Sequence, residues 1–205
     1  MSRKSASVRR EEILAATVEE IESTGLRTLR VADVAARLGL SPSLVIYHFV
    51  TKEALVAAAF AHAGENDLYR ARRLAAGRKP ARDRLNDVVR WYMPSGSTRS
   101  WKIWIDGWSA GLFDDEVRST FAALDREWKT ILSELIVAGL AAGEFRCTHS
   151  ADLADGSSTH VAESSATRIL AYLDGLAVQL IINPETVSPA TLSDWVDAFV
   201  SRELD

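Results

Sequence analysis

Apolar residues recur along this chain at the three- and four-residue spacing of amphipathic helices, and no stretch alternates as a strand would. With glycine and proline as stop signals, the pattern predicts an all-α fold of about nine helices. The predicted helices cover residues 8–24, 31–38, 42–50, 51–77, 80–93, 99–113, 115–142, 161–182 and 189–204. Breaks are predicted at Pro94 to Ser97 and at Asp155 to Thr159, where polar and turn-forming residues cluster.

The second and third predicted helices carry the most specific pattern in the chain. Gly39 ends the first of them as a residue that tolerates a left-handed C-cap, and Ser41 and Pro42 then start the next as N-cap and first helical residue. Ala35 is small enough for the two helices to cross closely, and Val45 packs back into the angle. This spacing is typical of a helix-turn-helix, whose second helix enters the major groove of DNA.

The run LRTLRVADVAARLGLSPSLVIYHFVTKEALV, residues 26–56, resembles the DNA-binding headpiece of the tetracycline-repressor (TetR) family of bacterial transcription regulators. The resemblance extends over roughly residues 8–62, and the stretch LAYLDGLAVQL, residues 170–180, is similar to the dimer-forming helix of the same family. It implies two domains, a helix-turn-helix domain over residues 1–52 and a helical regulatory, ligand-binding and dimerisation domain over residues 53–205.

The DNA contacts are predicted from the recognition helix and its flanks. Leu44, Val45 and Phe49 are expected to face inward, which turns the remaining side chains outward toward base edges and phosphates. The resemblance implies backbone contacts for three of these residues, Tyr47, His48 and Lys52. The full predicted set is Arg30, Ser41, Pro42, Ser43, Ile46, Tyr47, His48 and Lys52.

A stripe of indoles marks the predicted helix over residues 99–113, where Ile105 and Leu112 lie on the same face. Indoles offer flat apolar walls with N–H donors, so we expect a site for a small apolar or aromatic effector, and a bulky core is the alternative. Asp106 lies off the stripe and is expected to be solvated. The predicted ligand-binding residues are Trp91, Trp101, Trp104, Trp108, Phe121 and Trp128.

The predicted helix over residues 161–182 carries more apolar surface than one buried stripe requires, and the helix over residues 189–204 is expected to pack against it. By resemblance they form a two-fold four-helix interface between two copies of the chain. The predicted interface residues are Leu173, Leu176, Leu180, Trp195 and Phe199.

Composition adds limits to this interpretation. The chain has 205 residues, 47% of them hydrophobic, which is enough for a sizeable core. The net charge of −4 argues against indiscriminate nucleic-acid binding, but residues 1–62 hold 8 basic against 7 acidic residues, and the remainder holds 16 against 21. With one cysteine, no secretory leader and no apolar run near the ~20 residues of a bilayer span, we expect a cytoplasmic protein without a membrane partner.

Three weaker motifs suggest other chemistry. Gly107 to Gly111 matches the G-x-S-x-G pattern of a hydrolase nucleophile elbow around Ser109, but the strands that such an elbow needs are not predicted. His149 with Asp152, and His160 with Glu163, have a spacing that could hold a metal, although solvated loop residues are the simpler interpretation. Cys147 has no neighbour that would activate its thiol.

Together these patterns predict a homodimeric transcriptional repressor that binds a palindromic double-stranded DNA operator and is released by an effector. No catalytic residue, metal or cofactor is predicted. Two alternatives remain open, an esterase that uses Ser109 and a DNA-binding protein without an effector.

Overall fold

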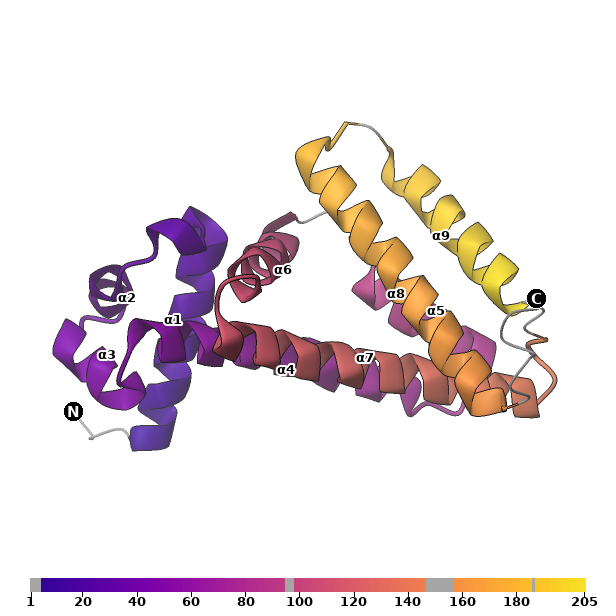
Figure 1. The fold of residues 1–205 in the computed structure, drawn as a ribbon, viewed down its shortest axis with the longest axis horizontal. Helices are drawn as coiled ribbons and strands as arrows, with labels where there is room; N and C mark the ends of the chain where they lie inside the picture. Colours follow the sequence, from indigo (N-terminus) through magenta and orange to yellow (C-terminus); the bar gives the residue numbers. More distant parts are fainter. Residues whose placement is uncertain (1–4, 95–97, 147–156, 186) are drawn as a thin grey trace. The chain divides into compact units, whose positions relative to one another are not determined.

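The structure is a computed structural model that describes residues 5–94, 98–146, 157–185 and 187–205, and every regular element in these ranges is helical (Figure 1). The all-α prediction is therefore confirmed. The elements are α1 (Ala6–Thr24), the 3-10 turn η1 (Leu26–Thr28), α2 (Val31–Arg37), α3 (Pro42–Phe49), α4 (Lys52–Ala75), α5 (Ala81–Tyr92), α6 (Thr98–Gly111), α7 (Asp115–Ala141), α8 (Ser158–Ile182) and α9 (Pro189–Leu204).

Local cap chemistry explains where several helices begin. The Ser41 hydroxyl accepts the Leu44 N–H at 3.3 Å and the Thr51 hydroxyl accepts the Ala54 N–H at 3.0 Å, as the sequence predicts. Ser188 caps α9 in the same way, with Pro189 in the first turn. Gly39 has φ 65°, so the corner between α2 and α3 uses the left-handed conformation that glycine tolerates.

The start of α8 differs from the prediction. Residues 155–159 were expected to loop out, yet Ser157 occupies the N-cap position and the helix begins at Ser158. Serine and threonine favour turns only weakly, and the buried face that begins at Val161 extends the helix toward its amino terminus. By length and composition α8 would also suit a membrane span, a property shared by core helices of soluble proteins.

The chain divides into two compact units, each with its own core. Unit 1 comprises residues 1–67 and 99–124, and unit 2 comprises residues 68–98 and 125–205. This division assigns α6 to the unit that holds the helix-turn-helix and splits both α4 and α7. The boundary predicted after Lys52 lies elsewhere, because it was placed at the end of the helix-turn-helix motif, whereas the two units are defined by which residues pack together.

In unit 1 the helix-turn-helix shares its core with α6 and the start of α7. Ile13, Val34, Val45 and Phe60 are buried in one cluster with Ile103. Also from α6, the Asp106 carboxylate accepts the Leu26 N–H at 2.7 Å, and Asp106 is half-buried. The expectation that Asp106 is solvated was wrong, because its partner lies 80 residues away in the sequence.

In unit 2, α8 and α9 run side by side (Figure 1). The rings of Tyr172 and Phe199 stack with centroids 4.0 Å apart. Arg168 Nε donates to the buried Glu203 carboxylate at 2.6 Å, and its other nitrogens donate to two serine hydroxyls of α8. A buried carboxylate without such a partner would be costly, so this pair fixes how the two helices meet.

Candidate DNA-binding surface and effector site

Helix α3 presents a polar and aromatic face to the solvent. Val45 and Phe49 are buried in the unit 1 core, whereas Pro42 and Ser43 are exposed and Tyr47 keeps 79% of its surface. The two buried residues hold the helix against the core, and its exposed tyrosine and serine are free to contact base edges and phosphates in a DNA groove.

Two residues of this helix lie differently from the prediction. Leu44 was expected to face inward but is exposed, and Ile46 was expected to face outward but is half-buried. A helix of eight residues makes only about two turns, so the spacing of its apolar residues alone does not determine which of them face the core. Ile46 is therefore a weaker candidate for a DNA contact than Ser43 or Tyr47.

The other predicted contact residues surround the recognition helix. Arg30 is exposed at the N-cap position of α2 and makes no side-chain cap bond. The Ser41 and Ser43 hydroxyls lie 2.9 Å apart, so one orients the other. His48 is half-buried with its ring edge-on to Tyr47 at 5.5 Å, and Lys52 is half-buried in the first turn of α4.

The junction between α3 and α4 is a strained turn centred on Val50. Its φ of 68° and ψ of −52° are close to those of a γ-turn, and the Thr51 N–H donates to the Phe49 carbonyl across it at 2.8 Å. A β-branched residue is unfavourable in this left-handed region, where it costs on the order of 1–3 kcal/mol. The turn lets the recognition helix meet α4 at 72°.

Replacing Val50 with glycine should therefore stabilise the protein by about 1 kcal/mol, because glycine adopts this conformation without steric cost. Chemical denaturation monitored by circular dichroism would measure the change. Val50→Ala, which keeps a Cβ but removes the branch, should have a stability between those of the wild type and Val50→Gly. A Val50→Gly protein less stable than the wild type would mean that the Val50 side chain, 77% exposed, makes a favourable contact that outweighs the strain.

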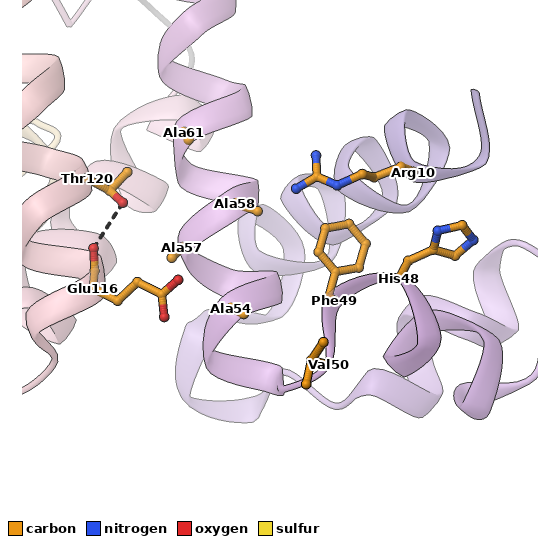
Figure 2. Close-up of a pocket in the computed structure, with 10 residues that line it drawn as sticks. All are labelled: Arg10, His48, Phe49, Val50, Ala54, Ala57, Ala58, Ala61, Glu116 and Thr120. Atoms are coloured by element: carbon orange, nitrogen blue, oxygen red, sulfur yellow. Dashed lines mark hydrogen bonds between the residues drawn. The ribbon is translucent and has the colours of Figure 1, made fainter. Parts of the chain in front are cut away.

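A cavity of about 320 Å³ lies beside this junction within unit 1 (Figure 2). Its floor is the alanine face of α4, and Figure 2 shows the Arg10 side chain alongside the Phe49 ring, with the guanidinium carbon 4.8 Å from the ring centroid. The lining residues are Arg10, His48, Phe49, Val50, Ala54, Ala57, Ala58, Ala61, Glu116 and Thr120. This cavity contains none of the predicted ligand-binding aromatics.

Four of the predicted effector residues lie in unit 1, in two contacting pairs. Trp101 and Trp108 meet edge to face at 6.3 Å, and Trp104 meets Phe121 at 5.6 Å. Trp101 is buried and the other three are half-buried. Leu112, expected on the same stripe, is instead exposed beyond the end of α6.

The other two predicted residues lie in unit 2. Trp91 is partly exposed, and the Arg70 guanidinium lies 4.3 Å from the centroid of its ring, so one of its faces is already taken. Trp128 is buried against the edge of the Tyr92 ring at 4.7 Å.

Asp174 is a further candidate that the sequence did not suggest. It accepts a hydrogen bond at 2.7 Å from the hydroxyl of Tyr92, whose ring also contacts Trp128. Burial raises the pKa of Asp174 from its ordinary value of 3.8 to about 6, against the opposing effect of the Tyr92 hydrogen bond. The available signal was a single carboxylate within the apolar run LAYLDGLAVQL. A half-buried acid beside aromatic rings is a candidate for binding a cation.

The predicted dimer residues are only partly available at the surface of one chain. Leu173 is 1% exposed and packs inside its own unit, whereas Trp195 on α9 is 45% exposed. Leu176, Leu180 and Phe199 are half-buried. The α8 and α9 surface also exposes small residues, namely Ala171, Gly175 and Ala198.

The alternative chemistries find little support where the structure describes them. Ser109 is exposed in the last turn of α6, so a helix precedes it instead of the strand of a nucleophile elbow. His160 and Glu163 are exposed on the first turns of α8, and no group of three metal-binding side chains occurs among the described residues. Cys147, His149 and Asp152 lie outside the described residues.

Comparison with known proteins identifies the family. A model described as bacterial regulatory proteins, tetR family, matches residues 13–59, and one described as BetI-type transcriptional repressor, C-terminal, matches residues 81–205. This chain belongs to the TetR family. The second match covers more than half of the chain, which makes it a TetR-family protein with a BetI-type C-terminal region and confirms the resemblance seen in the sequence.

Relatives of this TetR-family chain include transcriptional regulators named BetI. The BetI of Burkholderia cenocepacia (strain HI2424) is 32% identical over 111 residues, which are 52% of this chain and 57% of that relative. The BetI of Paraburkholderia xenovorans is 31% identical over 115 residues, which are 54% of this chain and 58% of that relative. The chain thus spans a little over half the length of the curated relatives it matches.

Solved structures of the same fold include a transcriptional regulator from Saccharomonospora viridis in complex with choline. It is 22% identical with a TM-score of 0.83, covering 97% of this chain and 98% of that one. A TetR transcription regulator from Haloarcula marismortui is 19% identical with a TM-score of 0.81, covering 97% and 100%. These similarities establish the fold.

Proposed function

We propose that this TetR-family chain is a transcriptional repressor that binds a palindromic DNA operator as a homodimer in the cytoplasm and releases it when a small molecule binds. The observation that carries the proposal is the recognition helix, whose exposed Ser43 and Tyr47 are backed by the buried Val45 and Phe49. A helix fixed in this way can read a major groove without first having to be ordered.

Two substitutions on this surface should affect DNA binding in different ways. Lys52→Ala should weaken binding to all duplexes alike and reduce the slope of log affinity against log salt by about one, because one phosphate contact is lost. Ser43→Ala should instead change the preference among sequences. Titration of labelled duplexes at several salt concentrations measures both. A folded Lys52→Ala protein with the wild-type slope would rule out the phosphate contact.

The dimer is proposed to form through α8 and α9. Trp195, Gly175 and Ala198 offer an exposed surface of small residues beside one large aromatic, which allows two copies of the helix pair to approach closely. A two-fold axis through this surface would place two recognition helices on the two halves of a palindrome.

The effector is proposed to be a small cation with apolar substituents, such as a quaternary ammonium. The Asp174 carboxylate, the Tyr92 ring and the Trp128 ring lie together in unit 2, and both carboxylates and aromatic faces attract such a cation. The choline complex of the Saccharomonospora viridis protein, which shares the fold, supports this choice. This cationic effector replaces the small apolar or aromatic effector expected from the sequence.

Asp174→Asn should therefore abolish or strongly reduce choline binding measured by calorimetry, while Asp197→Asn, at an exposed ion pair of the same unit, should not.

In the wild type, choline affinity should fall as the pH drops through about 6, because protonation neutralises Asp174. The same group should make the free protein more stable as the pH falls from 6 toward 4, since its raised pKa favours the protonated form in the folded state. Equal choline binding by the wild type and Asp174→Asn would refute this site.

A further inference from the structure

The link between α1 and the helix-turn-helix is held by a side chain from α6. The Asp106 carboxylate accepts the backbone N–H of Leu26 at 2.7 Å, across 80 residues of sequence. Leu26 opens the 3-10 turn η1, directly after Gly25, which ends α1 with φ 85°. An N–H at the start of such a turn has no partner within the turn, and Asp106 supplies one.

The same turn sets the entry of α2. Leu29, the C-cap residue directly after η1, is buried in the unit 1 core, and Arg30 follows as the N-cap of α2 without a side-chain cap bond. The direction in which the chain enters the helix-turn-helix therefore depends on the η1 turn, and the η1 turn is bonded to α6.

Helix α6 is itself fixed against the helices of unit 1. Gly107, next to Asp106, is buried, and a methyl group added there would lie 2.1 Å from the Phe121 ring of α7 and 3.1 Å from the Phe60 ring of α4. The two phenylalanine rings meet edge to face at 5.1 Å. Because α6 packs this closely, the carboxylate of Asp106 has a defined position relative to the reading helices.

We propose that Asp106 is a positioning residue for operator recognition: by holding the η1 turn, it sets the orientation of the helix-turn-helix relative to α6. This inference rests on the proposed DNA-binding function. It gives α6 a direct connection to the helix-turn-helix through one hydrogen bond.

The test compares Asp106→Ala, Asp106→Asn and the control Ser109→Ala, which changes an exposed residue of the same helix. Hydrogen exchange of the Leu26 amide and affinity for a selected operator duplex are measured on each folded protein, with circular dichroism to establish folding. Asp106→Ala should speed the exchange and weaken operator binding by roughly ten-fold or more, since a charge-assisted hydrogen bond is lost. Asp106→Asn keeps an acceptor oxygen, so it should retain most of the Leu26 amide protection and most of the operator affinity. Ser109→Ala should match the wild type in both measurements.

Faster Leu26 exchange in Asp106→Ala with unchanged operator affinity would reduce Asp106 to a structural contact and overturn the inference, as would unchanged exchange. If the wild-type protein itself enriches no duplex, the proposed repressor function fails first, and the inference falls with it. These two failures are distinguished by the wild-type result alone.

Discussion

Gly107→Val should destabilise the protein by about 3 kcal/mol, at the upper end of what overpacking a helical core costs. The Cβ alone would lie 2.1 Å from Phe121 Cζ and 2.4 Å from Cε2 of the same ring. Phe121 cannot simply swing aside, because its ring also meets Phe60 at 5.1 Å and Trp104 at 5.6 Å. Urea denaturation monitored by circular dichroism measures the loss.

Two further variants show whether the loss comes from this contact. Ser109→Val places the same side chain on the exposed face of α6 and should cost well under 1 kcal/mol, as surface substitutions do. Phe121→Leu should restore part of the stability of Gly107→Val by vacating the space of the ring. If Gly107→Val is as stable as Ser109→Val, α6 does not pack as tightly in unit 1 as the structure shows.

Gly175→Arg should convert the protein to a monomer and lower its operator affinity by on the order of 100-fold or more, because the linked binding of two headpieces is lost. Within one chain a Cβ at Gly175 meets nothing within 4 Å, so the substitution leaves the monomer core untouched. In the proposed dimer it would bring a large charged group into the α8–α9 interface, where it would be desolvated without a partner. Analytical ultracentrifugation and duplex titration measure the two effects.

The matched control is Ala123→Arg, which adds the same charge at an exposed position of α7. It should leave the oligomeric state unchanged. Leu173→Glu is a poorer test, because Leu173 is buried within its own chain and the substitution would unfold the monomer core as well. A dimeric Gly175→Arg protein, or a wild type that is monomeric at micromolar concentration, would contradict the proposed interface.

The sequence predicted best what depends on neighbouring residues. The starts of α3 and α9 follow from Ser41-Pro42 and Ser188-Pro189, because an N-cap needs only a side-chain oxygen and the amide two or three residues later. The corner at Gly39 is local in the same sense. These signals, together with the spacing of apolar residues, were sufficient for the helical fold and for the location of the helix-turn-helix.

Contacts between distant segments could not be predicted in this way. Asp106 and Leu26 carry no signal of their pairing, since either would be unremarkable as a solvated residue. The apolar pattern of α8 could not show that Leu173 faces its own core, because a stripe that packs inside a chain and one that packs between chains have the same spacing. The predicted aromatic residues likewise fall into separate contacts in two units, and the Tyr92–Asp174 hydrogen bond, on which the proposed effector site rests, has no signal in the sequence.

Selection of bound duplexes from a random pool with the wild-type protein tests most directly whether the chain is a dimeric repressor. We expect enrichment of a near-palindrome whose half-sites lie about one helical turn (~34 Å) apart, bound by two chains and lost from the Gly175→Arg protein at the same concentration. Absence of any enriched sequence, or enrichment of a single asymmetric site bound by one chain, would contradict a dimeric repressor.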